Sequence, residues 1–485
     1  MAEDLSSRFS PTNEREETYA KFRKKYRNKP ARFVLDCVKF KDGEKPTDYQ
    51  LEILQSIISR RRVTTRGPHG LGKTALASWA ILWFALVHDI DHDWKIPTTA
   101  SAWRQLTKFL WPEIKKWARR LDWEKIGRGP FTENKELLTM SLRLSTGEAF
   151  ALASDDSANI EGAHADFIMY IFDESKTIPD ATWDSAEGAM STGETYWLAI
   201  STPGEPVGRF YDIHQRKKGY QDWWVRHVTL QEFIDSGRIR ADWAYNRMLQ
   251  WGEKSAVYIN RVLGDFAQSD ADAVVPLSWV EAANGRWLDL EDSGTLANLN
   301  VDQIGIDVAR QGEDDSVFAL RSGDVITELI THHIDDTMQL VGQIVPHLRR
   351  HSIAHAVVDV IGIGAGVYDR LHEQYPERVS YFNARERTDL IDRSETWSFV
   401  DKRSASYWKL RESLDPAYNS VVALPPDDKL IGDLTTPKWY AMSNGRIQVE
   451  SKEDIKKRIS RSTDTGDAVA YAFWAEILGG DIEFG

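Results

Sequence analysis

The chain has 485 residues, of which 42% are hydrophobic and 28% charged, and its formal net charge is −13. This length exceeds one ordinary hydrophobic core and predicts two or three domains. The acidic balance excludes a protein coated with basic surface for nucleic acid, so any contact with DNA must be local. No apolar run reaches membrane-spanning length, and the first residues are too polar for a targeting signal, so the sequence predicts a protein inside the cell with no membrane partner.

Cysteine, basic and tryptophan residues add little to a functional interpretation. Cys37 is the single cysteine, which excludes an intramolecular disulfide and a zinc site built from several thiolates. Basic runs at 21–29, 59–66 and 456–458 are most simply solvated faces. A group of tryptophans lies in a stretch that we expect to be helical and to pack in the core rather than stack on bases. The group is Trp94, Trp103, Trp111, Trp117 and Trp123.

Composition divides the chain into five segments. They are a charged N-terminal arm at 1–44, an α/β region at 45–210, a helical region at 211–285, a linker at 286–300 and a second α/β region at 301–485. The linker is assigned because Gly, Asn, Asp and Ser interrupt both the helical and the strand periodicity there.

The first α/β region contains a glycine-rich loop at 67–74, with the sequence GPHGLGKT, before a long apolar segment. It matches G-x-x-x-x-G-K-[ST] at every fixed position. The glycines (Gly67, Gly70 and Gly72) allow backbone N–H groups to surround phosphate oxygens. Lys73 then supplies a charge to the β and γ phosphates of ATP, and Thr74 offers a hydroxyl to Mg²⁺. The alternative is an ordinary glycine loop.

A second motif lies about a hundred residues downstream, where the apolar strand 167–172 ends in Asp173 and Glu174. Burial of the strand predicts that both acids lie at the carboxyl edge of a sheet, beside the glycine loop. There Asp173 can hold the Mg²⁺ shell, and Glu174 can orient or deprotonate the attacking water. An acidic pair after a strand is often only a helix N-terminal charge. With the glycine loop it predicts ATP hydrolysis.

Two weaker signals accompany these motifs. The next strand, 196–200, is followed by Ser201 and Thr202, whose hydroxyls can sense a γ-phosphate or simply end the strand in a turn. Tyr49 and Gln50, a short helix before the loop, are placed to contact adenine.

In the second α/β region the apolar segments predict three strands in hairpin order, followed by alternating helices and strands in a mixed sheet. Helices are expected near 336–350, 365–375 and 402–414, and a final helix is expected to stop at Gly479.

Carboxylates recur in this region within apolar surroundings. Asp307 lies in the apolar strand 304–308 and Asp359 in the strand 356–360, where a carboxylate is costly unless it is paired or binds a cation. Asp467 lies on the final helix, on one face with Asp464. Three acids from two strands and a late helix suit a pair of Mg²⁺ ions that cleave a phosphodiester, as in nucleases of the RNase H kind.

Each acid also has a structural interpretation. Asp359 can be a turn or cap residue before Gly362, and Asp467 a solvated helix residue. Asp314 and Asp315, in the turn after the first strand, add a peripheral ligand or only solvate a hairpin.

Together, the glycine loop, the acidic strand end, the Ser201–Thr202 strand and the three late aspartates resemble the large terminase subunit of tailed bacteriophages, over about residues 45–480. The segments 98–105, 110–114 and 159–166 are also similar to elements of that family. The resemblance implies an N-terminal ASCE-type P-loop ATPase with a helical lid and a C-terminal RNase H-like nuclease.

The resemblance also implies a function. ATP hydrolysis would thread double-stranded DNA through the portal into a procapsid, and the nuclease, with Mg²⁺ or Mn²⁺, would cut concatemeric DNA. The implied partners are DNA, the portal protein, the small terminase subunit and further copies of the chain in a ring. The implied location is the host cytoplasm, with transient docking on the procapsid.

One position departs from the family. Many terminases carry an arginine inside the glycine loop, where this chain has His69. The sequence therefore does not decide which arginine stabilises the transition state. The candidates are Arg66, Arg104, Arg143 and an arginine of a neighbouring subunit. Two other functions fit the same motifs: a helicase-nuclease of repair or recombination, and an ATP-binding assembly scaffold with structural carboxylates.

Overall fold

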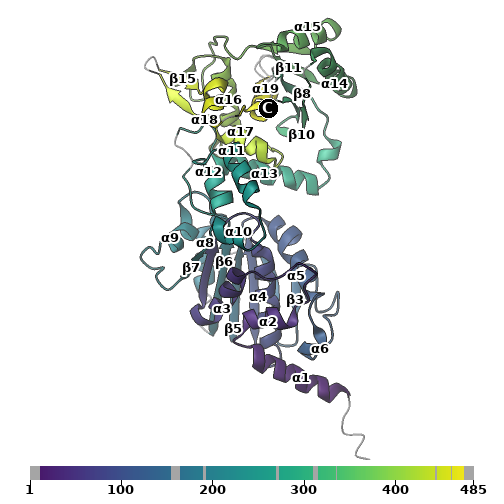
Figure 1. Cartoon of the computed structure of the whole chain (residues 1–485), viewed down its shortest axis with the longest axis vertical. Coiled ribbons are helices and arrows are strands. Elements are labelled where there is room, and N and C mark those ends of the chain that lie inside the picture. The colour runs from purple at the N-terminus through teal and green to yellow at the C-terminus, as the bar shows by residue number, and fades with distance from the viewer. Residues whose placement is uncertain are drawn as a thin grey trace, which may run out of the picture. The chain divides into compact units, whose positions relative to one another are not determined.

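The computed structural model describes residues 11–153, 164–188, 193–268, 272–309, 315–334, 336–442, 445–459 and 461–474. The chain forms two compact units (Figure 1). Unit 1 comprises Met1–Ala241 and Asn260–Ala267, and unit 2 comprises Asp242–Ile259 and Gln268–Gly485. Within the described ranges, every helix is too short or too polar to cross a bilayer.

Unit 1 is built on a seven-stranded sheet with the order β3-β4-β2-β5-β6-β1-β7. All neighbouring strands are parallel except β3 and β4. One strand, β6, separates β1, which precedes the glycine loop, from β5, which ends in the acidic pair. This order is that of the ASCE-type P-loop fold. The strands are β1 (Arg62–Arg66), β2 (Trp94–Ala100), β3 (Ser141–Arg143), β4 (Gly147–Ala153), β5 (Phe167–Asp173), β6 (Glu194–Ser201) and β7 (Trp224–His227).

Helices cover both faces of this sheet. Helix α4 (Lys73–His88) is apolar on all sides and almost entirely buried, since it lies between the sheet and an outer layer of helices. On the other face, Trp183, Ile213 and Trp223 form a separate core with the strands. The remaining helices of the unit are α1 (Pro11–Tyr26), α2 (Pro30–Cys37), α3 (Asp48–Arg60), η2 (Gln105–Leu110), α5 (Trp111–Ala118), α6 (Trp123–Ile126), η3 (Ser175–Thr177), α8 (Asp180–Gly188), α9 (Gly208–His214), α10 (Leu230–Asp235) and η5 (Ile259–Leu263).

Unit 2 contains a five-stranded sheet with the order β10-β9-β8-β11-β12. The sheet is mixed, and its first three strands are in hairpin order, as the sequence predicted. The first three strands are antiparallel, and β11 and β12 add in parallel to β8. This is the RNase H-like order. The strands are β8 (Gln303–Asp307), β9 (Ser316–Ser322), β10 (Val325–His332), β11 (His355–Asp359) and β12 (Val379–Phe382).

Alternation along β8 directs its side chains to two layers. Ile304 and Ile306 pack in the core with α14 and α15, whereas Gly305 faces α19. A Cβ at Gly305 would lie 2.0 Å from the Ala468 carbonyl oxygen, so α19 packs directly on the strand. Asp307, two residues after Gly305, faces the same side. The helices of the unit are α11 (Ala241–Trp251), α12 (Ala256–Tyr258), α13 (Leu277–Asp292), η6 (Leu296–Asn298), α14 (Thr337–Arg350), α15 (Gly364–Gln374), α16 (Lys402–Leu414), η7 (Pro416–Tyr418), α17 (Asp428–Thr435), α18 (Lys452–Ile459) and α19 (Asp464–Trp474).

A small sheet with the order β13-β15-β14 completes unit 2. Its parallel pair joins β13 (Ser398–Phe399) to β15 (Arg446–Val449), and β14 (Trp439–Ala441) is antiparallel to β15.

Three secondary-structure predictions are wrong. Strand β7 lies within 211–285, which the sequence predicts to be helical, because it adds to the sheet beside β1. Residues 286–292 continue helix α13 rather than forming an irregular linker, because the Asn284 side chain donates to the carbonyls of Leu424 and Pro425 and so stabilises the helix from outside. Trp94 begins strand β2 rather than lying in a helix, and Trp103 is 49% exposed, although Trp111 and Trp117 are buried in the core as expected. The predicted helix stop at Gly479 lies outside the described residues.

Candidate functional site

The glycine loop of unit 1 requires its glycines for two different reasons. Gly70 and Gly72 have φ values of +88° and +78°, in the left-handed region that side chains disfavour. At Gly67 a Cβ would lie 2.3 Å from the Leu71 side chain and 2.9 Å from the Val228 carbonyl oxygen. The loop therefore brings its backbone close to neighbouring groups and leads directly into the N-terminus of α4, where helix N–H groups favour an anion.

Lys73 extends from the first turn of α4 to the tip of strand β6. Its Nζ donates to Thr202 Oγ1 at 2.6 Å, and the side chain is buried. Burial lowers the pKa of Lys73, an effect that Glu174 and Asp173 partly oppose. Thr74 follows in the same helical turn. The loop lysine and the Ser201–Thr202 strand, predicted separately, thus lie in contact.

The acidic pair lies at the same edge of the sheet. Asp173 is the last residue of β5, only 3% exposed, and its Oδ1 accepts a hydrogen bond of 3.1 Å from the Glu174 N–H. Burial, and next the neighbouring Glu174, raise the pKa of Asp173 to about 7. Glu174 has a φ of +47°, and its Oε2 accepts a hydrogen bond from Ser201 Oγ at 3.1 Å. This bond fixes the direction of the Glu174 carboxylate.

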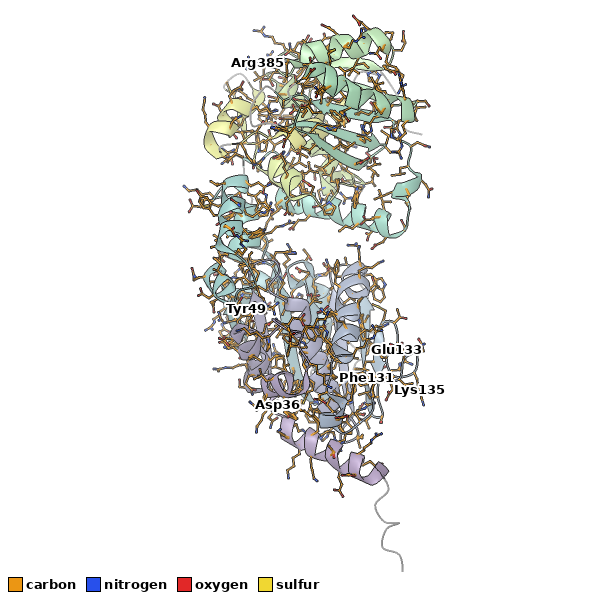
Figure 2. All side chains as sticks on the ribbon, turned by 45° about the vertical axis from the view of Figure 1, so that its right-hand side comes forward. Asp36, Tyr49, Phe131, Glu133, Lys135 and Arg385 are labelled. Carbon is orange, nitrogen blue, oxygen red and sulfur yellow. The ribbon has the colours of Figure 1, made fainter. Side chains whose placement is uncertain are left out.

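Tyr49 and Gln50 on α3 hydrogen-bond to the backbone of the loop, and Tyr49 is labelled in Figure 2. Tyr49 Oη donates to the Leu71 carbonyl at 3.0 Å, and Gln50 Nε2 donates to the Gly72 carbonyl at 3.1 Å. Gln50 Oε1 in turn accepts from Arg238 Nη2 at 3.2 Å. The structure shows a bracing role for both residues, and contact with adenine stays a prediction.

A pocket of about 500 Å³ opens beside Gly72 and Thr74. Aromatic rings form part of its wall: Phe40 packs edge-on against Trp79, and Trp117 packs against both. Arg238, which follows α10, also lines it. Sequence reasoning missed Arg238 because it lies far along the chain from the glycine loop and in no recognisable motif. The other lining residues are Glu44, Lys45, Ala75, Lys108, Phe109, Pro112, Glu113 and Lys116.

The three arginines considered from sequence have different surroundings. Arg66 contacts Asp265 at 3.0 Å and His214 Nδ1 at 3.0 Å, and burial lowers its pKa. Arg143, an exposed side chain at the end of β3, pairs with Glu148 at 3.1 Å. The Arg104 guanidinium lies 5.6 Å from the centre of the Phe109 ring.

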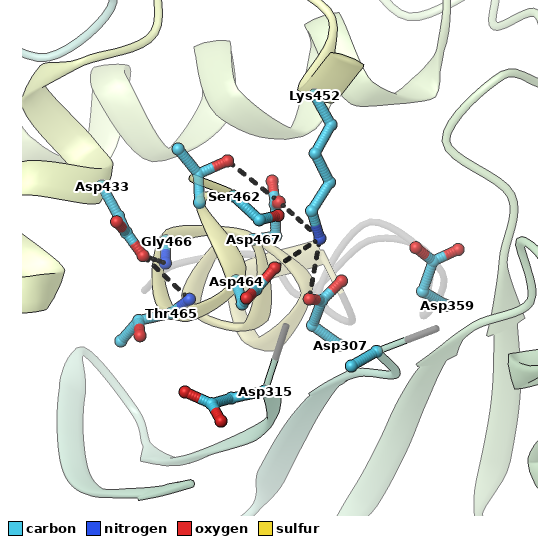
Figure 3. Close-up of polar contacts among 12 residues, drawn as sticks. Asp307, Asp315, Asp359, Asp433, Lys452, Ser462, Asp464, Thr465, Gly466 and Asp467 are labelled. Atoms are coloured by element: carbon cyan, nitrogen blue, oxygen red, sulfur yellow. Dashed lines mark hydrogen bonds and ion pairs between the residues drawn. The ribbon is translucent and has the colours of Figure 1, made fainter. Parts of the chain in front are cut away.

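In unit 2, four aspartates gather around one lysine. Asp307 and Asp359 end the parallel neighbours β8 and β11, and Asp464 and Asp467 lie in the first turn of α19. Figure 3 shows the Lys452 ammonium among them. Its Nζ lies 2.8 Å from Asp307 Oδ2, 3.0 Å from Asp464 Oδ1 and 3.2 Å from Asp467 Oδ2.

The two strand aspartates are held differently. Asp307 is 1% exposed, and within the described residues its Oδ1 has no hydrogen-bond partner. Burial raises the pKa of Asp307 well above its usual value although Lys452 lowers it. Asp359 Oδ1 accepts from the Ile361 N–H at 2.9 Å, and its Oδ2 accepts from Tyr471 Oη at 3.4 Å. Burial also raises the pKa of Asp359.

Asp467 is fully buried and extensively hydrogen-bonded. Its Oδ1 accepts from Arg403 Nη1 at 2.5 Å and from Tyr407 Oη at 2.8 Å, and its Oδ2 accepts from Thr463 Oγ1 at 3.1 Å. Burial alone would raise its pKa, but Arg403 and Lys452 outweigh burial and hold the pKa below the usual value.

This oxygen-rich set has the chemistry that Mg²⁺ and Mn²⁺ prefer. Asp307, Asp464 and Asp467 pair with Lys452, and Asp467 also pairs with Arg403. Asp307 keeps a buried oxygen without a hydrogen-bond partner in the described part of the chain. Among the described residues, however, no three carboxylate, imidazole or thiol groups are already spaced to hold one ion. The residues therefore fit a divalent metal provided that the Lys452 ammonium moves from between the carboxylates.

A cleft of about 370 Å³ leads to this cluster. Asp359, Asp464 and Lys452 line it, and Arg385, at the edge of unit 2, lies at its wall (Figure 2). Figure 3 shows Asp315 apart from the contacts of Lys452. The Asp315 carboxylate pairs instead with Lys429 at 3.0 Å. Asp314 lies outside the described residues. Sequence reasoning missed Lys452, Arg403 and Tyr407, for which no local pattern gave a signal.

The fold and the two clusters define a protein that joins an ASCE-type P-loop ATPase fold to an RNase H-like nuclease fold. No protein-family model matches the chain. The chain is 24% identical over 474 residues to a protein named probable terminase, large subunit, from Enterobacteria phage P7, an alignment that covers 90% of this chain and 89% of the relative. The resemblance to large terminase subunits that the motifs predicted is therefore confirmed.

Solved structures with a similar fold are also terminases. One is the large terminase of a thermophilic bacteriophage, with 13% identity, a TM-score of 0.41 and coverage of 90% of this chain and 100% of that one. Another is the nuclease domain of the large terminase subunit gp2 of bacterial virus Sf6, with 18% identity, a TM-score of 0.35 and coverage of 41% of this chain and 96% of that one.

Proposed function

We propose that the chain is the motor and nuclease subunit of a phage DNA-packaging machine. In this proposal unit 1 hydrolyses ATP to translocate double-stranded DNA through the portal into a procapsid, and unit 2 cuts concatemeric DNA. The main support for this proposal is that one chain contains two separate sites. One is a phosphate loop beside an acidic strand end, and the other is a buried aspartate cluster beside a basic residue. The resemblance to a terminase large subunit supports the same function.

In unit 1 the residues divide the chemistry of ATP hydrolysis. The N–H groups of 70–72 and the α4 N-terminus bind phosphate, and Lys73 neutralises the charge that develops on it. Thr74 and Asp173 would hold Mg²⁺, which when bound neutralises phosphate charge. Ser201 orients Glu174, which either positions the attacking water or accepts a proton from it. Thr202, in contact with Lys73, is placed to sense whether the γ-phosphate is present.

In unit 2 the aspartate carboxylates would hold Mg²⁺ or Mn²⁺, ions that when bound activate water and stabilise the leaving oxygen in phosphodiester cleavage. The chain's own contribution is a fixed set of oxygens at the ends of β8 and β11 and on α19. Lys452 and Arg403 partly neutralise the charge of these carboxylates.

The proposal includes the partners that the resemblance implies. They are double-stranded DNA, the portal protein, the small terminase subunit and further copies of this chain in a ring, in the host cytoplasm and transiently on the procapsid.

The test is to separate the two activities by mutation. Lys73→Ala is expected to reduce ATP turnover by at least about 100-fold, because the phosphate charge loses its neutralising group, and to leave Mg²⁺-dependent cleavage of plasmid within about two-fold. Asp307→Ala is expected to do the reverse. Phosphate release and plasmid cleavage are measured on the same preparations.

Matched controls lie in each unit. Lys135→Ala changes an exposed lysine of unit 1, and Asp315→Ala changes an aspartate outside the cluster, so both should keep both activities. Equal loss of both activities in folded Lys73→Ala protein would contradict the division of labour. Unwinding in a strand-displacement assay would favour a helicase-nuclease instead, and absence of any cleavage with Mg²⁺ or Mn²⁺ would favour an assembly scaffold.

A further inference from the structure

Unit 2 contains a further cavity, of about 390 Å³, which we call the α18 cavity. Helices α11, α12, α13, α17 and α18 all contribute to its wall. Its lining residues belong to unit 2 alone, and the four site aspartates are not among those that the structure describes at the wall. The volume lies in the range of small-molecule sites, so the chemistry of the wall decides which ligand the cavity suits.

The wall of the α18 cavity is positively charged, although the whole chain has a net charge of −13. Lys254, Lys438 and Arg458 line it, and the acidic lining residue within the described ranges is Glu253. Three positive charges against one negative charge attract an anion. The cavity is therefore a local exception to the acidic balance of the chain.

Two of the basic side chains have carboxylate partners of different kinds. Lys438 Nζ lies 3.2 Å from Asp272, and the two side chains are 25% and 42% exposed. Such a pair contributes little to stability, so a phosphate can replace Asp272 at Lys438. Arg458 instead pairs with the buried Glu450 at 2.6 Å and donates to the Thr436 carbonyl at 2.9 Å. These contacts fix the Arg458 guanidinium at the wall.

A buried hydroxyl at the wall has no protein partner. Thr436 is 5% exposed, and its Oγ1 makes no hydrogen bond with the part of the chain that the structure describes. Buried polar atoms in proteins nearly always have a partner, so an orphaned one indicates a ligand or an ordered water. A hydroxyl can both donate and accept, as the edge of a nucleobase requires.

The rest of the wall is largely apolar. Its apolar residues are Trp251, Ala256, Ala273, Val275, Leu277 and Ile459. A bare phosphate would leave these side chains without contact, and an uncharged ring would leave the basic side chains without an anion. A nucleoside phosphate matches both, because its phosphate suits Lys438 and Arg458 and its base suits the apolar wall.

Helix α18 connects this cavity with the cleft that leads to the aspartate cluster. Arg458 and Ile459 line the α18 cavity, whereas Lys452 and Lys456 of the same helix line the cleft. Lys452 is the residue whose ammonium contacts Asp307 at 2.8 Å. Because α18 has only eight residues, a ligand that displaces Arg458 also displaces the backbone that carries Lys452.

We propose that the α18 cavity binds a nucleoside phosphate, and that the bound nucleotide changes DNA cleavage by shifting α18 and Lys452. The binding site stands on the cavity itself, whereas the effect on cleavage rests on the proposed nuclease function. A free nucleotide and the phosphorylated end of a DNA strand share this chemistry, and the experiment separates the two sources.

The site is tested by calorimetric titration of the full chain carrying Lys73→Ala with dAMP in EDTA. Lys73→Ala weakens the phosphate loop and EDTA removes divalent ions, so that the heat reports the α18 cavity. Saturable binding is expected. Lys438→Gln should weaken it at least about 10-fold, because a charged hydrogen bond is lost, and Thr436→Val about 5-fold, because a neutral one is lost.

Lys429→Gln is the matched control, since it breaks a pair with Asp315 at 3.0 Å whose side chains are 28% and 31% exposed. dAMP should bind this variant as it binds the parent. Thr436→Val removes a hydroxyl that makes no hydrogen bond with the described chain, so its Tm should not fall. Absence of saturable binding in the parent, or equal binding in the parent, Lys438→Gln and Thr436→Val, would overturn the site.

The source of the ligand follows from a second titration, with a 5′-phosphorylated tetranucleotide. Tighter binding than that of dAMP, weakened in the same way by Lys438→Gln, would assign the cavity to a DNA end. Weaker binding would assign it to a free nucleotide.

The effect on cleavage is tested by amide hydrogen exchange of 452–459 and by plasmid cleavage with Mn²⁺, each with and without saturating dAMP. Exchange in α18 should change, and cleavage should change at least about 5-fold in the parent and less in Thr436→Val at the same dAMP concentration. Unchanged exchange and cleavage despite bound dAMP would overturn the link through α18. Absence of cleavage in every condition would instead contradict the proposed nuclease function, while dAMP binding would still support the cavity.

Discussion

Lys73 and Lys452 illustrate how the surroundings of a residue, rather than its type, decide its properties. Burial lowers the pKa of Lys73, whose direct contact is the neutral Thr202 hydroxyl. Burial would also lower the pKa of Lys452, but its ion pairs with Asp307, Asp467 and Asp464 outweigh this effect and raise the pKa well above the ordinary value. The Lys73 ammonium thus contacts a neutral hydroxyl, as suits a lysine that binds phosphate. Lys452 is an internal counter-ion.

At the residue scale, His88 should make unit 1 sensitive to acid. Its ring is buried against Phe84 and Phe167, and burial lowers its pKa from the ordinary 6.5 to about 3. The unfolded chain therefore binds a proton at His88 below pH 6.5 that the folded chain does not, so the free energy of unfolding falls as pH decreases from 6.5 toward 3. Between pH 6.5 and 5 the loss is about 2 kcal/mol.

His88→Asn should remove most of this pH dependence, because the amide does not titrate and can still donate to the Phe84 carbonyl as His88 Nδ1 does. The measurement is urea unfolding followed by tryptophan fluorescence at pH 7 and pH 5. His372→Asn on α15 of unit 2 serves as control. An equal pH slope in wild type and His88→Asn would show that the buried imidazole is not responsible.

At the scale of elements, helix α19 depends on a cap that comes from another helix. Its N-terminal N–H groups at Thr465 and Gly466 bond to Asp433 on α17, which lies 32 and 33 residues earlier in the chain. Asp433 is fully buried and also pairs with Arg461. Burial raises the pKa of Asp433 to about 6, although Arg461 opposes this. The helix that carries two of the four site aspartates is therefore held in place by tertiary contacts.

Asp433→Ala should destabilise unit 2 by about 3 kcal/mol, because it leaves the partly buried Arg461 guanidinium and two helix N–H groups without their acceptor. The Tm, followed by circular dichroism, should fall by several degrees. Asp427→Ala is the matched control, since it removes a local and exposed cap, bonded to the Leu430 N–H, and should lower stability by only about 1 kcal/mol. A smaller effect at Asp433 than at Asp427 would contradict the tertiary cap.

At the scale of the whole molecule, the chain has two compact units with separate cores. One core surrounds α4 and the other packs α14 and α15 against β8 and β11. Each unit carries one of the two candidate sites. Such an organisation allows one site to be altered without loss of the other, which the mutational test of the proposed function uses.

Differential scanning calorimetry should therefore resolve two transitions that respond to different ligands. A ligand stabilises only the unit that binds it, by about 2.7 kcal/mol at a concentration one hundred times its Kd. A non-hydrolysable ATP analogue with Mg²⁺ should raise one transition, and Mn²⁺ alone should raise chiefly the other. Asp307→Asn should cancel the shift by Mn²⁺ alone. A single transition that both ligands raise would contradict independent units.

The sequence by itself determined the features that depend on local pattern. The glycine loop, the acids at the ends of buried strands and the alternation along β8 each follow from spacing within a few residues. The five strands of the mixed sheet in unit 2 and the strands β5 and β6 of unit 1 could therefore be predicted. The same local rules failed at 286–292, where contacts from Leu424 and Pro425 maintain a helix through Asn284 and Gly285.

Only the tertiary structure decided which distant side chains meet. Lys452 contacts Asp307 across 145 residues of chain, and Arg403 contacts Asp467 across 64. No local sequence pattern predicts such pairs. They depend on how helices and loops pack around the sheet, and not on the secondary structure in which each residue lies. The sequence placed Asp464 and Asp467 on one helix face, and the packing of α16, α17 and α18 around α19 gave them different surroundings.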